Sequence, residues 1–123
     1  MKSLKRIYVV IPAVVEVTDK QMVTQPVGRQ IAQACHVVTK LRHKTLRSEK
    51  DFIPVTTIIL HARDQNEMFH VSQLLQKRKM SPIFFSDENA AVYGAVRPIT
   101  AMAVYASKKQ VEDILGYLPL WEA

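Results

Sequence analysis

With 123 residues, 48% of them hydrophobic and 23% charged, the chain has the length and composition of a single globular domain, over residues 1–123. Its formal net charge of +6 is compatible with a polyanionic partner, although many basic proteins bind no nucleic acid. The single cysteine excludes an intrachain disulfide and a cysteine-rich zinc site. The sequence has no run of about 20 apolar residues and no cleavable signal after Met1, which predicts a cytoplasmic protein without a membrane span.

The first part of the chain predicts β-structure followed by a long helix. Residues 7–17 are apolar and β-branched but contain Pro12, which indicates either one bent strand or two short strands. Residues 18–27 are predicted to form a polar loop. The helix is expected to run from Gly28 to about Arg47, and its basic last turns favour the negative end of the helix dipole.

This helix has two different sides. At offsets of 4, 7 and 11 residues its polar side carries Arg29, Gln33, His36 and Lys40. A row of such donors suits a phosphate or a polarised carbonyl, but the same pattern is also typical of a solvated helix face, and both interpretations remain open. The mostly apolar side, which is predicted to pack on a sheet, carries Val27, Ile31, Ala34, Cys35, Val38 and Leu41. Cys35 is therefore expected to be packed and unreactive.

The rest of the chain alternates between the two periodicities. The segments expected to form strands are 55–61, 83–86 and 99–105. Two further helices are expected to begin at Asp64 and Ser107, with capping-box partners at Glu67 and Gln110. This alternation predicts an α/β fold in which helices cover the faces of a sheet.

Several of these segments, in this order, resemble one known family. Gly28 to His36, with the sequence GRQIAQACH, resembles the first-helix motif of the type 2 peptidyl-tRNA hydrolases, which runs Gly-Lys, three small or apolar residues, Gln, two small residues and His. The other similar positions are Ala62-Arg63-Asp64, Asp87, Thr100 and the stretch from Leu118 to Trp121. The resemblance extends over roughly residues 18–121.

The resemblance implies a three-layer α/β/α sandwich with a four-stranded mixed sheet and about three main helices, usually in a homodimer. Such proteins hydrolyse the ester that joins a peptide to the 3′ end of tRNA, and they need no metal or other cofactor. The partner implied here is therefore tRNA or peptidyl-tRNA. The catalytic candidates carried over are Arg29, His36, Asp87 and Thr100. The candidates for substrate binding are Gln33, Lys40 and Lys44.

These residue types suit ester hydrolysis, which needs an oriented water, a proton acceptor and a donor for the oxyanion. Asp87 is the candidate for the water, Arg29 for the oxyanion or a phosphate, and Thr100 for the ester. Two departures from the family pattern favour an alternative. Arg29 replaces a lysine, and the family's Asp-Ala-Gly-Arg-Thr segment becomes residues 87–91, DENAA, which places Glu88 beside Asp87. The alternative is a catalytically inactive relative that acts as a binding or regulatory module.

Overall fold

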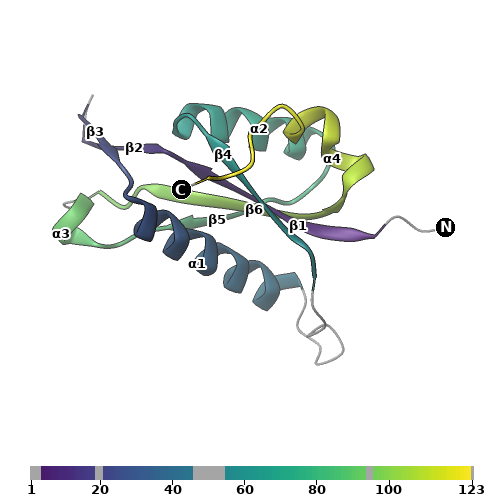
Figure 1. The fold of residues 1–123 in the computed structure, drawn as a ribbon, viewed down its shortest axis with the longest axis horizontal. Helices are drawn as coiled ribbons and strands as arrows, with labels where there is room; N and C mark the ends of the chain where they lie inside the picture. Colours follow the sequence, from purple (N-terminus) through teal and green to yellow (C-terminus); the bar gives the residue numbers. More distant parts are fainter. Residues whose placement is uncertain (1–3, 19–20, 46–54, 94–95, 123) are drawn as a thin grey trace.

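The computed structural model describes residues 4–18, 21–45, 55–93 and 96–122 (Figure 1). The strands are β1 (Lys5–Pro12), β2 (Val14–Thr18), β3 (Gln21–Thr24), β4 (Thr57–Ala62), β5 (Ile83–Ser86) and β6 (Ile99–Ser107). The helices are α1 (Val27–Thr45), α2 (Gln65–Lys77), the single turn α3 (Ala90–Tyr93) and α4 (Lys108–Leu115). Among the described residues, no helix is both long enough and apolar enough to cross a membrane.

Four strands form a mixed sheet in the order β4-β1-β6-β5. β1 runs parallel to β4, and β6 runs antiparallel to both β1 and β5. Figure 1 shows α1 on one face of this sheet and α2 beside α4 on the other. The predicted α/β/α sandwich with a four-stranded mixed sheet and three main helices is therefore confirmed.

The central strand β1 explains why both faces need helices. Ile7, Val9 and Ile11 point into the core under α1, whereas Tyr8 and Val10 point into the core under α2 and α4. All five are buried, as expected where side chains alternate along a strand that is covered on both sides. The sheet thus separates two cores. Residues at an end of the sheet are therefore positioned by packing on both of its faces.

The region between β1 and α1 differs from the predicted polar loop. The apolar stretch 7–17 forms two strands, and β2 turns away from the main sheet to pair with β3 in an antiparallel hairpin. Val15 and Val17 of this hairpin pack against Tyr93 of α3. The prediction of a loop over 18–27 is therefore wrong at β3, because contacts with a distant segment stabilise a strand in which only two of the four residues are apolar.

The buried side of α1 also differs from the prediction. Val27 and Ile31 are 43% and 50% exposed, and Cys35 is exposed as well. The residues that α1 buries are Gln30, Gln33, Ala34, Val37 and Leu41. The helix is rotated from the expected orientation because distant segments provide hydrogen-bond partners for both groups of the Gln30 amide and for the Nε2 of Gln33. The expected end of this helix, residues 46 and 47, lies outside the described residues.

Both predicted caps are present, at Asp64 and Ser107, but the reciprocal bond of a capping box forms only at α4, because Glu67 reaches one residue past Asp64. The Asp64 carboxylate accepts the backbone N–H of Glu67 at 2.9 Å, and the Glu67 side chain reaches back to accept the N–H of Arg63 at 2.9 Å. At the start of α4, the N–H of Ser107 donates to Gln110 Oε1 at 2.9 Å. These bonds satisfy backbone groups that a helix start leaves unpaired, so they fix where α2 and α4 begin.

Candidate functional site

The predicted site residues come from the end of the sheet at which β5 ends and β6 begins. Asp87 directly follows β5, and its backbone N–H donates to the Pro98 carbonyl at 3.0 Å just before β6. The first half of α1 crosses the same end of the sheet on one face. Residues that lie far apart in the sequence are therefore brought together here.

Asp87 faces α1. Its Oδ2 accepts a hydrogen bond of 2.5 Å from Gln33 Nε2, and its Oδ1 accepts the backbone N–H of Asn89 at 2.9 Å. The Gln33 side chain is only 1% exposed, whereas Asp87 is half-buried. The carboxylate is thus held at the surface by a donor that is itself fixed in the core.

Tyr93 joins Arg29 to this carboxylate. Its ring lies under the Arg29 guanidinium, with 5.7 Å from the guanidinium carbon to the ring centroid. Burial and, after it, the negative charge of Asp87 raise the pKa of Tyr93, while the positive charge of Arg29 and hydrogen bonds from Arg29 and Gln33 oppose that rise. Arg29, Gln33, Asp87 and Tyr93 therefore form one electrostatically connected cluster.

A set of buried glutamines supports the cluster from behind. Tyr93 Oη donates to Gln25 Oε1 at 3.2 Å, and Gln25 Nε2 donates to the Pro12 carbonyl at 2.8 Å. Gln30 Nε2 donates to the Gln25 carbonyl at 2.7 Å, and Gln30 Oε1 accepts the indole N–H of Trp121 at 2.7 Å. Sequence reasoning missed Tyr93, Gln25 and Gln30, and a glutamine in a helix or loop gives no sign that it will be buried.

The other predicted residues continue the row along α1 or lie beneath it. His36 is exposed and stacks on Phe85 of β5, with 4.8 Å between ring centroids. Lys40 is exposed and donates to the Phe84 carbonyl at 2.6 Å, and Lys44 is exposed one turn further on. The row that begins at Arg29 therefore lies along β5 and the segment after it, which favours a binding strip over a freely solvated face.

Thr100 lies under the site rather than on its surface. The side chain is completely buried, and its Oγ1 is 3.5 Å from the Phe85 carbonyl, at the outer limit for a hydrogen bond. This position at the start of β6 links the strand that leads to Asp87 with the sheet. Direct contact between Thr100 and a substrate would need a local movement.

Two buried polar atoms in the cluster have no partner in the part of the chain that the structure describes. They are Nε of Arg29 and Oε1 of Gln33. A buried donor or acceptor without a partner costs about 1–3 kcal/mol, so such groups are rare unless they serve a purpose. A donor and an acceptor left unpaired beside a carboxylate are suited to a ligand that has both kinds of group.

The acidic segment after Asp87 is partly neutralised. Glu88 is exposed and forms an ion pair of 3.2 Å with Arg97, which comes from the segment just before β6. The extra negative charge beside Asp87 is therefore matched by a cation that the sequence comparison did not identify. The arrangement reduces the repulsion that a tRNA phosphate would meet there.

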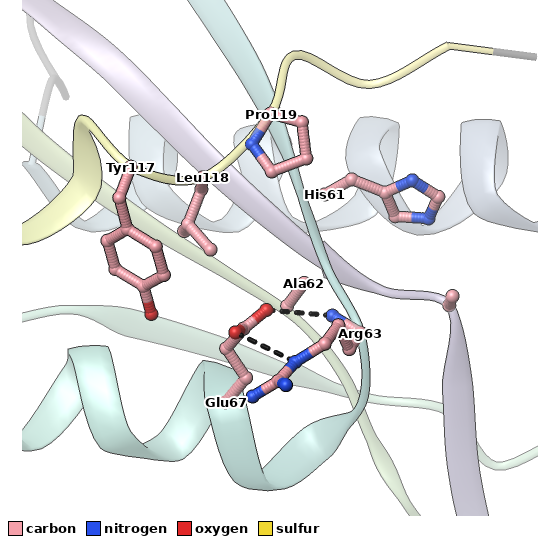
Figure 2. A pocket seen from close by; sticks show the side chains of 8 residues that line it. His61, Ala62, Arg63, Glu67, Tyr117, Leu118 and Pro119 are labelled. Atoms are coloured by element: carbon pink, nitrogen blue, oxygen red, sulfur yellow. Dashed lines mark hydrogen bonds and ion pairs between the residues drawn. The ribbon is translucent and has the colours of Figure 1, made fainter.

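A separate open hollow of about 610 Å³ lies at the end of β4, between the start of α2 and the segment after α4 (Figure 2). In Figure 2 the Glu67 carboxylate contacts the backbone and side chain of Arg63, with 3.1 Å between Arg63 Nε and Glu67 Oε2, and Tyr117 leans toward it. None of the predicted site residues lines this hollow. We therefore keep the candidate site at Asp87.

Comparisons with known proteins bear on the fold and the family of the chain. A solved structure of a protein of unknown function from Agrobacterium tumefaciens has a TM-score of 0.62 and 14% sequence identity, with 96% of this chain and 98% of that one covered. At this identity the likeness supports the fold alone. A search of curated proteins finds no significant match. The family model of peptidyl-tRNA hydrolase PTH2 matches residues 13–121, and the chain belongs to that family.

Proposed function

We propose that the chain hydrolyses the ester between peptide and tRNA, with the Asp87 carboxylate at the centre of the reaction. The observation that carries the proposal is the 2.5 Å hydrogen bond between Gln33 Nε2 and Asp87 Oδ2. It joins the helix that holds the family's motif to the aspartate that follows β5. Family membership supports the substrate class, peptidyl-tRNA.

In the proposed reaction, Asp87 orients a water molecule and accepts its proton as the water oxygen attacks the ester carbonyl carbon. Arg29 stabilises the oxyanion that develops on the carbonyl oxygen. Collapse of the tetrahedral intermediate breaks the bond to the ribose oxygen, which takes the proton back from Asp87. The products are the free peptide acid and tRNA, so the reaction needs no further reactant.

The remaining residues are assigned to positioning and binding. Gln33 holds the carboxylate, and Thr100 supports the β5–β6 junction beneath it. Lys40 and Lys44 extend from the cluster along α1, and we assign them to the tRNA backbone, where exposed cations act mainly through phosphate contacts. His36, which is exposed and stacks on Phe85, stays a candidate for the reaction itself.

The test is cleavage of purified peptidyl-tRNA by the wild type and by Asp87→Asn, with Glu88→Gln as the matched control. Asp87→Asn keeps the size of the side chain but removes the proton acceptor, so we expect kcat/KM to fall by about 10²-fold or more. Glu88→Gln changes an exposed carboxylate one residue away and should stay within about twofold. Equal loss in both variants would contradict the assignment to Asp87.

The alternative is a binding module without hydrolytic activity. It is favoured by one observation, that both Asp87 oxygens already accept hydrogen bonds within the chain. This alternative predicts that the wild type binds tRNA but shows no turnover above the spontaneous rate. That result would overturn the hydrolase proposal.

A further inference from the structure

A narrow slot lies on the face of the sheet opposite α1, away from the proposed active site. It has a volume of about 230 Å³, is partly open to solvent, and lies between α4 and the strands β1 and β4. Its walls are mainly apolar and include Ile58, Leu60, Val111, Leu115, Leu118 and Leu120. We call this space the α4 slot.

Tyr8 of β1 lines the α4 slot and has an unused hydroxyl. Its side chain is 6% exposed, and within the described residues its Oη has no hydrogen-bond partner. Buried tyrosine hydroxyls usually find a partner, because leaving one unpaired costs about 1–3 kcal/mol. The hydroxyl oxygen itself is covered, so it can donate to a ligand oxygen in the slot once the side chains that cover it move aside.

Positive charge gathers where the α4 slot opens. Arg6 and Lys108 line the slot, and together with Lys109 they line a second hollow of about 470 Å³ that adjoins it. Glu112 is the one acidic residue among the lining residues of either space. None of these four side chains belongs to an ion pair in the described part of the chain. Three cations against one carboxylate favour an anionic group at this opening.

We propose that the α4 slot binds a small amphiphilic carboxylate. The alkyl or aryl part fills the apolar interior, and the carboxylate pairs with Arg6 and Lys108 while Tyr8 Oη donates to it. The size is suitable, since an apolar cavity of about 150 Å³ accommodates benzene and this slot is larger. The proposal does not depend on the hydrolase activity, because no residue of the slot belongs to the Asp87 cluster.

The probe for the test is octanoate, titrated into the full chain and followed by calorimetry and by amide chemical shifts. For about ten non-hydrogen atoms we expect a dissociation constant on the order of 0.1–1 mM. Octylammonium has the same chain with the opposite charge, and acetate has the charge without the chain. Both should bind at least tenfold more weakly. Equal binding of octylammonium, or no binding of octanoate, would overturn the proposal.

Two variants test the named contacts. Arg6→Gln combined with Lys108→Gln should weaken octanoate at least fivefold, whereas Lys77→Gln, an exposed cation at the end of α2, should leave the affinity unchanged. Tyr8→Phe removes the unpaired hydroxyl, so it should raise the melting temperature of the free protein and still weaken octanoate about threefold. A rise in melting temperature with unchanged affinity would show that the hydroxyl does not contact the ligand.

Discussion

At the scale of single residues, Tyr93 has the largest number of roles in the candidate site. Its ring supports the Arg29 guanidinium, its hydroxyl donates to Gln25, and its side chain packs against the valines of β2. One buried side chain therefore connects the charged surface of the site with the hairpin behind it.

Replacing Tyr93 by Phe should lower the free energy of unfolding by about 1–3 kcal/mol, because Gln25 Oε1 loses its donor while it stays buried. Urea denaturation measures the change. Tyr117→Phe is the matched control, since Tyr117 is 59% exposed, and its effect should stay within about 0.5 kcal/mol. A Tyr93→Phe protein as stable as the wild type would mean that this hydrogen bond contributes nothing.

The same phenol predicts a pH dependence. Burial and the nearby Asp87 charge raise the pKa of Tyr93, so the folded protein holds this proton more tightly than the unfolded chain does. The resulting stability is complete below the unfolded pKa and is lost as the pH rises through the folded value. An ultraviolet difference titration, wild type minus Tyr93→Phe, should show an ionisation more alkaline than that of an ordinary tyrosine. A transition at or below the ordinary value would contradict the prediction.

At the scale of elements, the start of α2 depends on a cap that the sequence predicts. Asp64→Ala removes the acceptor for the Glu67 N–H and should lower the free energy of unfolding by about 1 kcal/mol. Asp64→Asn keeps an acceptor and should retain most of the stability. Thermal and urea denaturation of the three proteins measure the difference, and equal stability of the Ala and Asn variants would show that the cap is unimportant.

The elements that the sequence predicts are those with an apolar or β-branched run or with a local cap. β4, β5, β6, α2 and α4 were all predicted in this way, close to their observed bounds. β3 and α3 have neither feature. They are held by packing between the β2–β3 hairpin and Tyr93 of α3, which no local sequence signal predicts. The rotation of α1 was unpredictable for the same reason, because the partners of Gln30 and Gln33 come from distant segments. Arg29 and Asp87 were found through family resemblance, whereas Tyr93 was found only in the structure.

At the scale of the whole molecule, the net charge of +6 predicts salt-dependent binding of tRNA. If Lys40 and Lys44 contact phosphates, replacing both by Gln should reduce the slope of log K against log salt by about 1–2, since each contact releases about one counter-ion. The control replaces Lys77 and Lys79, exposed at the end of α2 on the opposite face. Filter binding over a range of salt concentrations measures both slopes, and equal slopes would exclude α1 as the tRNA strip.

The homodimer that the resemblance implies stays a prediction, which light scattering at several protein concentrations tests. A dimer would have to bury surface that is exposed in the single chain. Ile31 and Val27 on α1 provide such surface, as they are 50% and 43% exposed. If the protein is a dimer and this face is the interface, replacing Ile31 by a charged residue should shift the protein toward the monomer. A dimer that the replacement leaves intact would exclude this face as the interface.

The segment after α4 gives the protein a built-in spectroscopic reporter. It runs beside β4, with His61 N–H donating to the Pro119 carbonyl at 2.9 Å and Trp121 N–H donating to the Ile59 carbonyl at 2.8 Å. Trp121 is the only tryptophan in the sequence, and its indole N–H donates to Gln30, one of the buried glutamines behind the Asp87 cluster. The preceding residue, Leu120, forms part of the α4 slot. Indole emission therefore follows the docking of this one segment without any label.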